Sequence, residues 1–171
     1  NISQILKGGI KVDTVYDRGN ANEPKNDIYN EYVKSVSGKR SAIQPGQVID
    51  LGSYVTVRCV VVNGKWSQTD SLTVNSESER SLGFLIEYNA FKFFTSGNLE
   101  GAIEDSIGVR VGNVSLLKAS QHGSKNSSSS FFLSQTRPNA VLISVGSPNG
   151  YGHPAQETLT RMDNIPSLQK I

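Results

Sequence analysis

The chain has 171 residues, with 17 basic and 15 acidic side chains and a formal net charge of +2. This length suits one domain with a substantial core, and the near balance of charge excludes a polycation that binds nucleic acid by charge alone. The only cysteine, Cys59, excludes an internal disulfide and is predicted to be buried in the apolar run VTVRCVVV. No run approaches the roughly 20 apolar residues of a membrane helix, and no signal-peptide pattern is present.

The first half of the chain is predicted to alternate between short helices and strands. ISQILKGG indicates a helix closed by Gly8 and Gly9, and residues 10–16 alternate like a half-buried strand. A surface helix is predicted over 28–36 and strands over 47–52 and 54–62. The polar stretch 63–80 is predicted to be a loop with a short strand at 70–74.

The second half of the chain predicts one sheet with helices packed outside it. Strands are expected at 82–88, 91–95, 114–118 and 140–145, with a tight turn at Asn89 between the first two. Helices are expected near 99–107, where Asn98 is the predicted N-cap, and at 128–135 and 155–163. Strands that alternate with helices favour the α/β class.

Three polar loops each follow an apolar strand and carry Asn98, His122 and His153. Loops at the carboxyl ends of strands converge in open sheets, so the three are expected to share one edge. Two imidazoles near a polar group can hold zinc or manganese. Spacing alone equally allows two surface histidines that bond backbone or water, and the serine tract 127–130 equally allows a simple helix cap.

Two segments carry a resemblance to a known family. RSLGFLIEYNAFKFFTSGNLEG and SLLKASQHGSKNSSSSFFLSQTRPNAVLISVGSPNGYGHP resemble the metallo-β-lactamase-like domain of the ComEC family of DNA-uptake proteins over about residues 80–160. The family pattern is a strand ending in T-G-D-L-E, the next in H-H-G-S-K and the last in an N-x-Y-G-H-P loop. The resemblance implies an αββα sandwich whose loops hold one or two metal ions that activate water for hydrolysis, often of a phosphodiester.

The family residues carry over only in part. His153 matches the histidine of the G-H-P loop, and His122 matches the second histidine of H-H-G-S. Asn98 stands at the aspartate of T-G-D, Ser96 at its threonine, and Gln121 at the first histidine. A neutral amide is a weaker ligand than a carboxylate. A divalent zinc or manganese ion is therefore expected to bind weakly or not at all to residues 1–171.

The family's H-x-H-x-D-H motif is expected upstream of residue 1. Residues 1–171 are accordingly interpreted as a single metallo-β-lactamase-like domain that is incomplete at its N-terminus, the C-terminal part of the αββα sandwich. A missing N-terminal half or a partner chain would supply the second sheet. The resemblance implies a bacterial protein, either extracytoplasmic or the soluble part of a membrane protein.

Three functions follow from these expectations. The first is a metal-dependent hydrolase, a phosphodiesterase or nuclease that acts on DNA or a nucleotide-like substrate. The second is a catalytically impaired relative that binds nucleic acid or protein, which Asn98 and Gln121 support, and the third is a structural module. The residues expected to contact a substrate are Gln121, Ser124, Lys125, Asn126, Ser127 and Tyr151.

Overall fold

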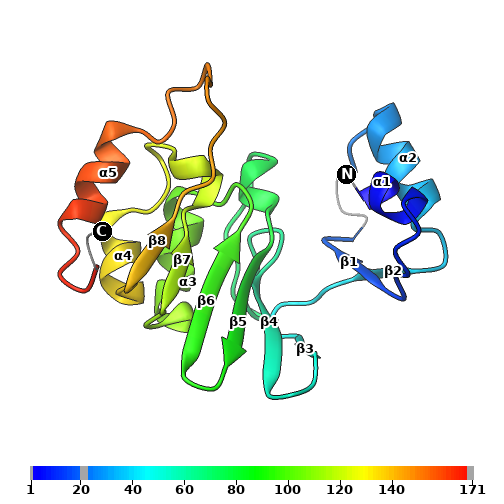
Figure 1. The fold of residues 1–171 in the computed structure, drawn as a ribbon, viewed down its shortest axis with the longest axis horizontal. Helices are drawn as coiled ribbons and strands as arrows, with labels where there is room; N and C mark the ends of the chain where they lie inside the picture. Colours follow the sequence, from blue (N-terminus) through cyan, green and yellow to red (C-terminus); the bar gives the residue numbers. More distant parts are fainter. Residues whose placement is uncertain (1, 20–22, 169–171) are drawn as a thin grey trace. The chain divides into compact units, whose positions relative to one another are not determined.

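The computed structural model describes residues 2–19 and 23–168, and the chain divides into two compact units, residues 1–44 and 45–171 (Figure 1). The expectation that residues 1–171 form a single domain stays a prediction.

Within residues 2–19 and 23–44, the first unit contains two helices and a two-stranded parallel sheet. Its elements are α1 (Ile2–Lys7), β1 (Val15–Asp17), α2 (Asp27–Ser35) and β2 (Arg40–Ala42), and Val15 pairs with Arg40. The predicted strand over 10–16 was too long, because only residues 15–17 find a partner strand. The side chain of Asn26 caps α2 by accepting a hydrogen bond from the Tyr29 N–H at 2.9 Å.

Arg40 ties the elements of this unit together. Its Nε donates to Oδ2 of Asp17 at 2.5 Å, and the Tyr32 hydroxyl donates to the same oxygen at 2.6 Å. The guanidinium also lies 5.7 and 5.9 Å from the ring centres of Tyr29 and Tyr32. Burial raises the pKa of Asp17, but the hydrogen bonds from Tyr32 and Arg40 outweigh it and leave the pKa below its usual value. The cluster joins β1, α2 and β2, so its role is to stabilise this unit.

The second unit is built on one six-stranded sheet. Its strands are β3 (Val48–Asp50), β4 (Val55–Val61), β5 (Gly83–Tyr88), β6 (Phe91–Ser96), β7 (Leu116–Lys118) and β8 (Ala140–Leu142), in that spatial order. Neighbours from β3 to β6 are antiparallel, whereas β6, β7 and β8 are parallel. The four strands predicted in this region are confirmed. Asn89 turns the β5–β6 hairpin with a φ of 51°.

Three helices cover one face of this sheet: α3 (Gly101–Val111), α4 (Ser130–Thr136) and α5 (Gln156–Asp163). Leu85, Phe94 and Leu117 are paired neighbours across β5, β6 and β7, and all three are fully buried in the core that these helices close. Figure 1 shows the helices gathered around the β6–β8 end of the sheet. The α/β class and the three predicted helices are confirmed.

The opposite face of the sheet is apolar and only half-buried. Val57, Ile86, Phe93 and Leu116 pair in register across four strands, and each keeps intermediate exposure. Residues i and i+2 of a strand share a face, so this row alternates with the buried one. The described residues of this unit therefore form two layers, one sheet and one layer of helices.

Two smaller expectations have opposite outcomes. Cys59 is fully buried as predicted, and burial raises the pKa of its thiol to about 12. The short strand predicted at 70–74 is wrong, because Ser71 forms only an isolated bridge with Lys65. Among the described residues, every helix is too short or too polar to span a bilayer.

Candidate functional site

The three polar loops meet at the carboxyl edge of β6, β7 and β8. The Gln121 N–H donates to the Gly97 carbonyl at 3.0 Å, which joins the loop after β7 to the loop after β6. The Ala155 N–H donates to the Gly123 carbonyl at 2.9 Å, which joins the loop after β8 to the loop after β7. Parallel strands end at the same edge. The prediction that these loops share one edge is confirmed.

His122 lies in a strained turn that orients its ring. Gln121, His122 and Gly123 have φ values of 45°, 56° and 76°, three consecutive residues in the left-handed region. Residues other than glycine pay about 1–2 kcal/mol each for this conformation. The Nδ1 of His122 lies 2.6 Å from the Ser144 carbonyl oxygen. A carbonyl only accepts, so Nδ1 carries a proton, and in the neutral imidazole Nε2 then keeps the lone pair that a metal ligand needs.

His153 is held by its own loop. The Asn149 side chain accepts from the His153 N–H at 3.1 Å and donates to the His153 carbonyl at 2.8 Å. The imidazole stacks on Tyr151, with ring centres 5.9 Å apart and planes inclined by 29°. Tyr151 itself is 85% exposed, so its other face is open to solvent.

Asn98 is exposed beside the histidine loop but does not cap α3. Its N–H donates to the Ser81 hydroxyl at 3.0 Å, while the N-cap position belongs to Glu100, whose side chain makes no capping bond. The predicted cap was wrong because α3 begins at Gly101, two residues later than expected, so that Glu100 and not Asn98 occupies the N-cap position.

The donors at this edge fit part of a metal site. Two neutral imidazoles suit zinc or manganese, and the amide of Asn98 offers one weaker oxygen. Among the described residues no group of three or more His, Cys, Asp or Glu side chains is placed to bind an ion. The described residues therefore do not supply a set of three such ligands for a divalent ion.

The segment of residues 123–128, here called the 123–128 loop, has its carbonyl groups turned inward. Each of these carbonyls accepts a hydrogen bond from the unit itself. The donors are the N–H groups of Ala155 and Gly101, the hydroxyls of Ser127 and Thr158, and the guanidinium of Arg161. The side chains of Lys125 and Asn126 stay exposed. The carbonyl oxygens of this loop are thus occupied inside the unit, while the ammonium of Lys125 faces solvent. Such a surface suits an anion.

The other predicted contact residues lie deeper. Ser127 is fully buried, and its hydroxyl donates to the carbonyls of Ser120 and Ser124 at 2.9 and 3.0 Å. Ser124 is 6% exposed. The amide oxygen of Gln121 is buried without a hydrogen-bond partner among the described residues. The serine tract also caps α4, since the Ser129 hydroxyl accepts from the Phe132 N–H at 3.0 Å.

Glu104 and Arg161 hold the 123–128 loop and were not predicted from the sequence. Oε2 of Glu104 accepts from the Ser128 N–H at 2.6 Å, and the residue is fully buried. Burial raises the pKa of Glu104 to about 7, although hydrogen bonds from Ser120 and Ser128 oppose the shift. A signal existed: residue 104 shares a helix face with Ile107 and Val111, an unusual place for a carboxyl.

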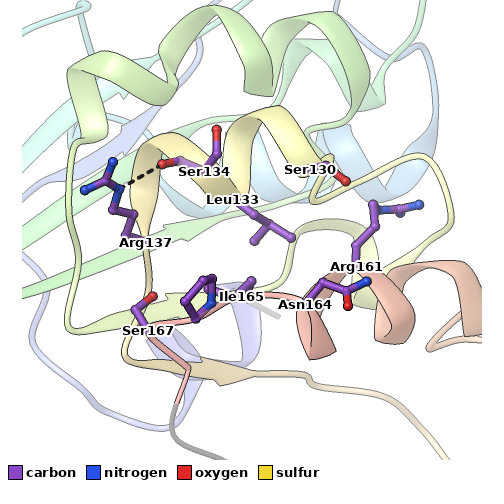
Figure 2. Close-up of a pocket in the computed structure, with 9 residues that line it drawn as sticks. Ser130, Leu133, Ser134, Arg137, Arg161, Asn164, Ile165 and Ser167 are labelled. Atoms are coloured by element: carbon purple, nitrogen blue, oxygen red, sulfur yellow. Dashed lines mark hydrogen bonds between the residues drawn. The ribbon is translucent and has the colours of Figure 1, made fainter.

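A separate cavity of about 660 Å³ lies between α4 and α5 (Figure 2). Leu133, Ile165 and Pro166 form its apolar part, and Arg137 and Arg161 stand at opposite ends. Neither histidine lines it. Its link to the histidine edge is Arg161, which rises from α5 towards the segment that precedes α4 in Figure 2.

Comparison with known proteins gives two similar relatives. ComE operon protein 3 of Bacillus subtilis (strain 168) is 33% identical over 86 residues, which cover 49% of this chain and 11% of that protein. Recombination protein 2 of Haemophilus influenzae (strain ATCC 51907 / DSM 11121 / KW20 / Rd) is 26% identical over 97 residues, 57% of this chain and 12% of that protein. The chain thus matches about a tenth of each relative's length.

No family model matches the chain. Among solved structures, Zn²⁺-bound PqqB from Methylobacterium extorquens aligns with a TM-score of 0.37 and 17% identity, over 61% of this chain and 36% of that one. That similarity is too low to assign a fold. The α/β class rests on the sheet and helices described above.

Proposed function

We propose that the chain is part of a metal-dependent hydrolase of the metallo-β-lactamase superfamily that acts on a phosphodiester, with a weakened metal site. The observation that carries this proposal is His122. Its strained backbone and its bond to Ser144 leave Nε2 with a free lone pair at the edge where the loop of His153 also lies. A divalent ion bound there would lower the pKa of a coordinated water.

The 123–128 loop supports the choice of substrate. Lys125 and Asn126 are exposed while the neighbouring carbonyls are occupied inside the unit. The ammonium of Lys125 and the amide of Asn126 lie in the loop that follows His122, and both groups can hydrogen-bond to the oxygens of a phosphate. One relative is named Recombination protein 2, a name that refers to a process of DNA. DNA, or a nucleotide-like diester, is therefore the proposed substrate.

A second candidate is a catalytically impaired relative that binds nucleic acid through the same edge. Asn98 and Gln121 favour it, because they offer no charge where the resemblance expects an aspartate and a histidine. Its distinguishing property is binding without hydrolysis.

The test is a hydrolysis assay on the complete protein, with Zn²⁺ or Mn²⁺, using single-stranded DNA and bis-p-nitrophenyl phosphate. The hydrolase requires metal-dependent cleavage that His122→Ala and His153→Ala abolish, and a raised KM in Lys125→Ala. Lys65→Ala, an exposed lysine outside these loops, is the matched control. DNA binding without cleavage would select the impaired relative, and neither binding nor cleavage would contradict both.

A further inference from the structure

Arg161 bonds three carbonyls of the 123–128 loop with one side chain. Its Nε donates to the Ser128 carbonyl at 3.0 Å, and its Nη2 donates to the carbonyls of Lys125 and Ser127 at 2.8 and 2.9 Å. The same Nη2 donates to the Thr158 hydroxyl at 2.9 Å, which in turn donates to the Ser124 carbonyl at 2.7 Å. A planar guanidinium can bridge several acceptors in this way, whereas an ammonium cannot reproduce the geometry.

Glu104 holds the same loop from α3. Its Oε2 accepts from the Ser128 N–H, so Ser128 has its N–H bound by a carboxyl and its C=O bound by a guanidinium. Ser128 has a φ of 53°, a left-handed conformation that a serine keeps only when its surroundings enforce it. Ser128 is also fully buried. The end of the loop is therefore held from two helices, by an acceptor on α3 and a donor on α5.

These hydrogen bonds fix the backbone on both sides of the Lys125 side chain. The Lys125 carbonyl is bound by Arg161 and its neighbour's carbonyl by the Gly101 N–H, while its side chain is exposed. The orientation of the peptide groups on either side of a residue fixes the direction of its Cα–Cβ bond, from which the side chain extends. If these hydrogen bonds were lost, the carbonyl oxygens could rotate towards an approaching anion and repel it. The ammonium of Lys125 would also occupy a wider range of positions, which weakens binding.

We propose that Arg161 and Glu104 are positioning residues, a clamp that orients the 123–128 loop so that Lys125 meets the phosphate of the substrate. This rests on the proposed function for the identity of the ligand. The clamp itself is a property of the folded unit and can be measured without any ligand.

The test compares Arg161→Lys with Arg137→Lys in the complete protein. Arg137 lines the same cavity, and its Nε donates to the Ser134 carbonyl at the end of α4, away from the loop. Three quantities are measured for each variant: the exchange rates of the amides of residues 124–128, the Kd for a fluorescein-labelled single-stranded oligonucleotide, and the Tm. Glu104→Ala and Glu104→Gln form a second pair, because glutamine keeps an oxygen for the Ser128 N–H.

The clamp predicts that Arg161→Lys speeds exchange in residues 124–128 and weakens oligonucleotide binding about tenfold, while core amides such as those of Phe94 and Leu117 stay protected. Arg137→Lys should change neither. Glu104→Gln should retain the slow exchange of the Ser128 amide that Glu104→Ala loses. Unchanged loop exchange in Arg161→Lys would overturn the clamp whether or not the oligonucleotide binds.

Faster loop exchange with unchanged affinity would overturn the positioning of Lys125. A wild-type protein with slow loop exchange but no affinity for the oligonucleotide would instead overturn the proposed function, together with the role of the clamp in binding phosphate. The failure of each proposal is thus separately visible.

Discussion

The loop of residues 120–128 and the loop of residues 144–155 each present one histidine at the same edge of the sheet, but they are held in different ways. Side chains from α3 and α5 bind the backbone of the first loop. The second loop is held chiefly by its own Asn149, which bonds Gly146 and both polar groups of the His153 backbone. A loop held from outside can keep strained conformations such as that of His122, because the enclosing unit enforces them.

The largest expected difference between the loops is a dependence on pH that enters through Glu104. The pKa of Glu104 is raised by burial from 4.5 to about 7. A carboxyl with a raised folded-state pKa contributes stability that is fully present below pH 4.5 and lost as the pH rises through about 7. The loss amounts to about 3 kcal/mol. Urea unfolding from pH 4 to 8 should therefore show a slope that Glu104→Gln removes.

Glu157→Gln is the control for that measurement, since Glu157 is exposed on α5. It should keep the pH dependence of the wild type. If Glu104→Gln shows the same pH dependence as the wild type, the pKa of Glu104 does not differ between the folded and the unfolded state, and the prediction is wrong.

The next effect in size is steric and compares one glycine from each loop. Gly123 has a φ of +76°, and an added Cβ would lie 3.0 Å from the Cβ of Pro154. Gly123→Ala should therefore lower the free energy of unfolding by about 2 kcal/mol. Gly146→Ala should be nearly neutral, because an added Cβ there meets nothing within 4 Å. Equal Tm values for the two variants would contradict the close contact between the loops.

The smallest effect is expected in the loop that holds itself. Asn149→Ala removes three hydrogen bonds, one exposed and two partly buried, and all three lie within one surface loop, so the free energy of unfolding should fall by only about 1 kcal/mol. The amide of His153 should nevertheless exchange faster, because its acceptor is lost. Asn75→Ala, in an exposed loop of the same unit, is the control. Hydrogen exchange that stays slow at His153 would show that other contacts hold this loop.

Local patterns in the sequence predicted the elements but not the clamp. The apolar runs around Asn89 predicted the β5–β6 hairpin, and the alternation of strands and helices predicted the sheet. Glu104 lies 24 residues from Ser128, and Arg161 lies 33 residues from it. Such contacts are set by how α3 and α5 pack on the sheet, and periodicity carries no information about them.

The candidate site was also predicted only in part: the sequence singled out its histidines but not the burial of its serines. His122 and His153 were singled out because each follows a strand, and the parallel order of β6, β7 and β8 brings their loops together. The burial of Ser127 was not predictable, because a serine tract reads equally as a polar surface and as a helix cap. The role of every predicted site residue in binding metal or substrate stays a prediction.

The most direct test of the account is the affinity and stoichiometry of Zn²⁺ and Mn²⁺ in the complete protein beside its Asn98→Asp and Gln121→His variants. Asn89→Asp is the control, because it adds the same charge at the opposite end of β6. The account predicts at most one weakly held ion in the wild type and binding about 10 to 100-fold tighter in the two variants but not in the control. Two ions bound stoichiometrically by the wild type, with affinities that neither variant raises, would contradict it.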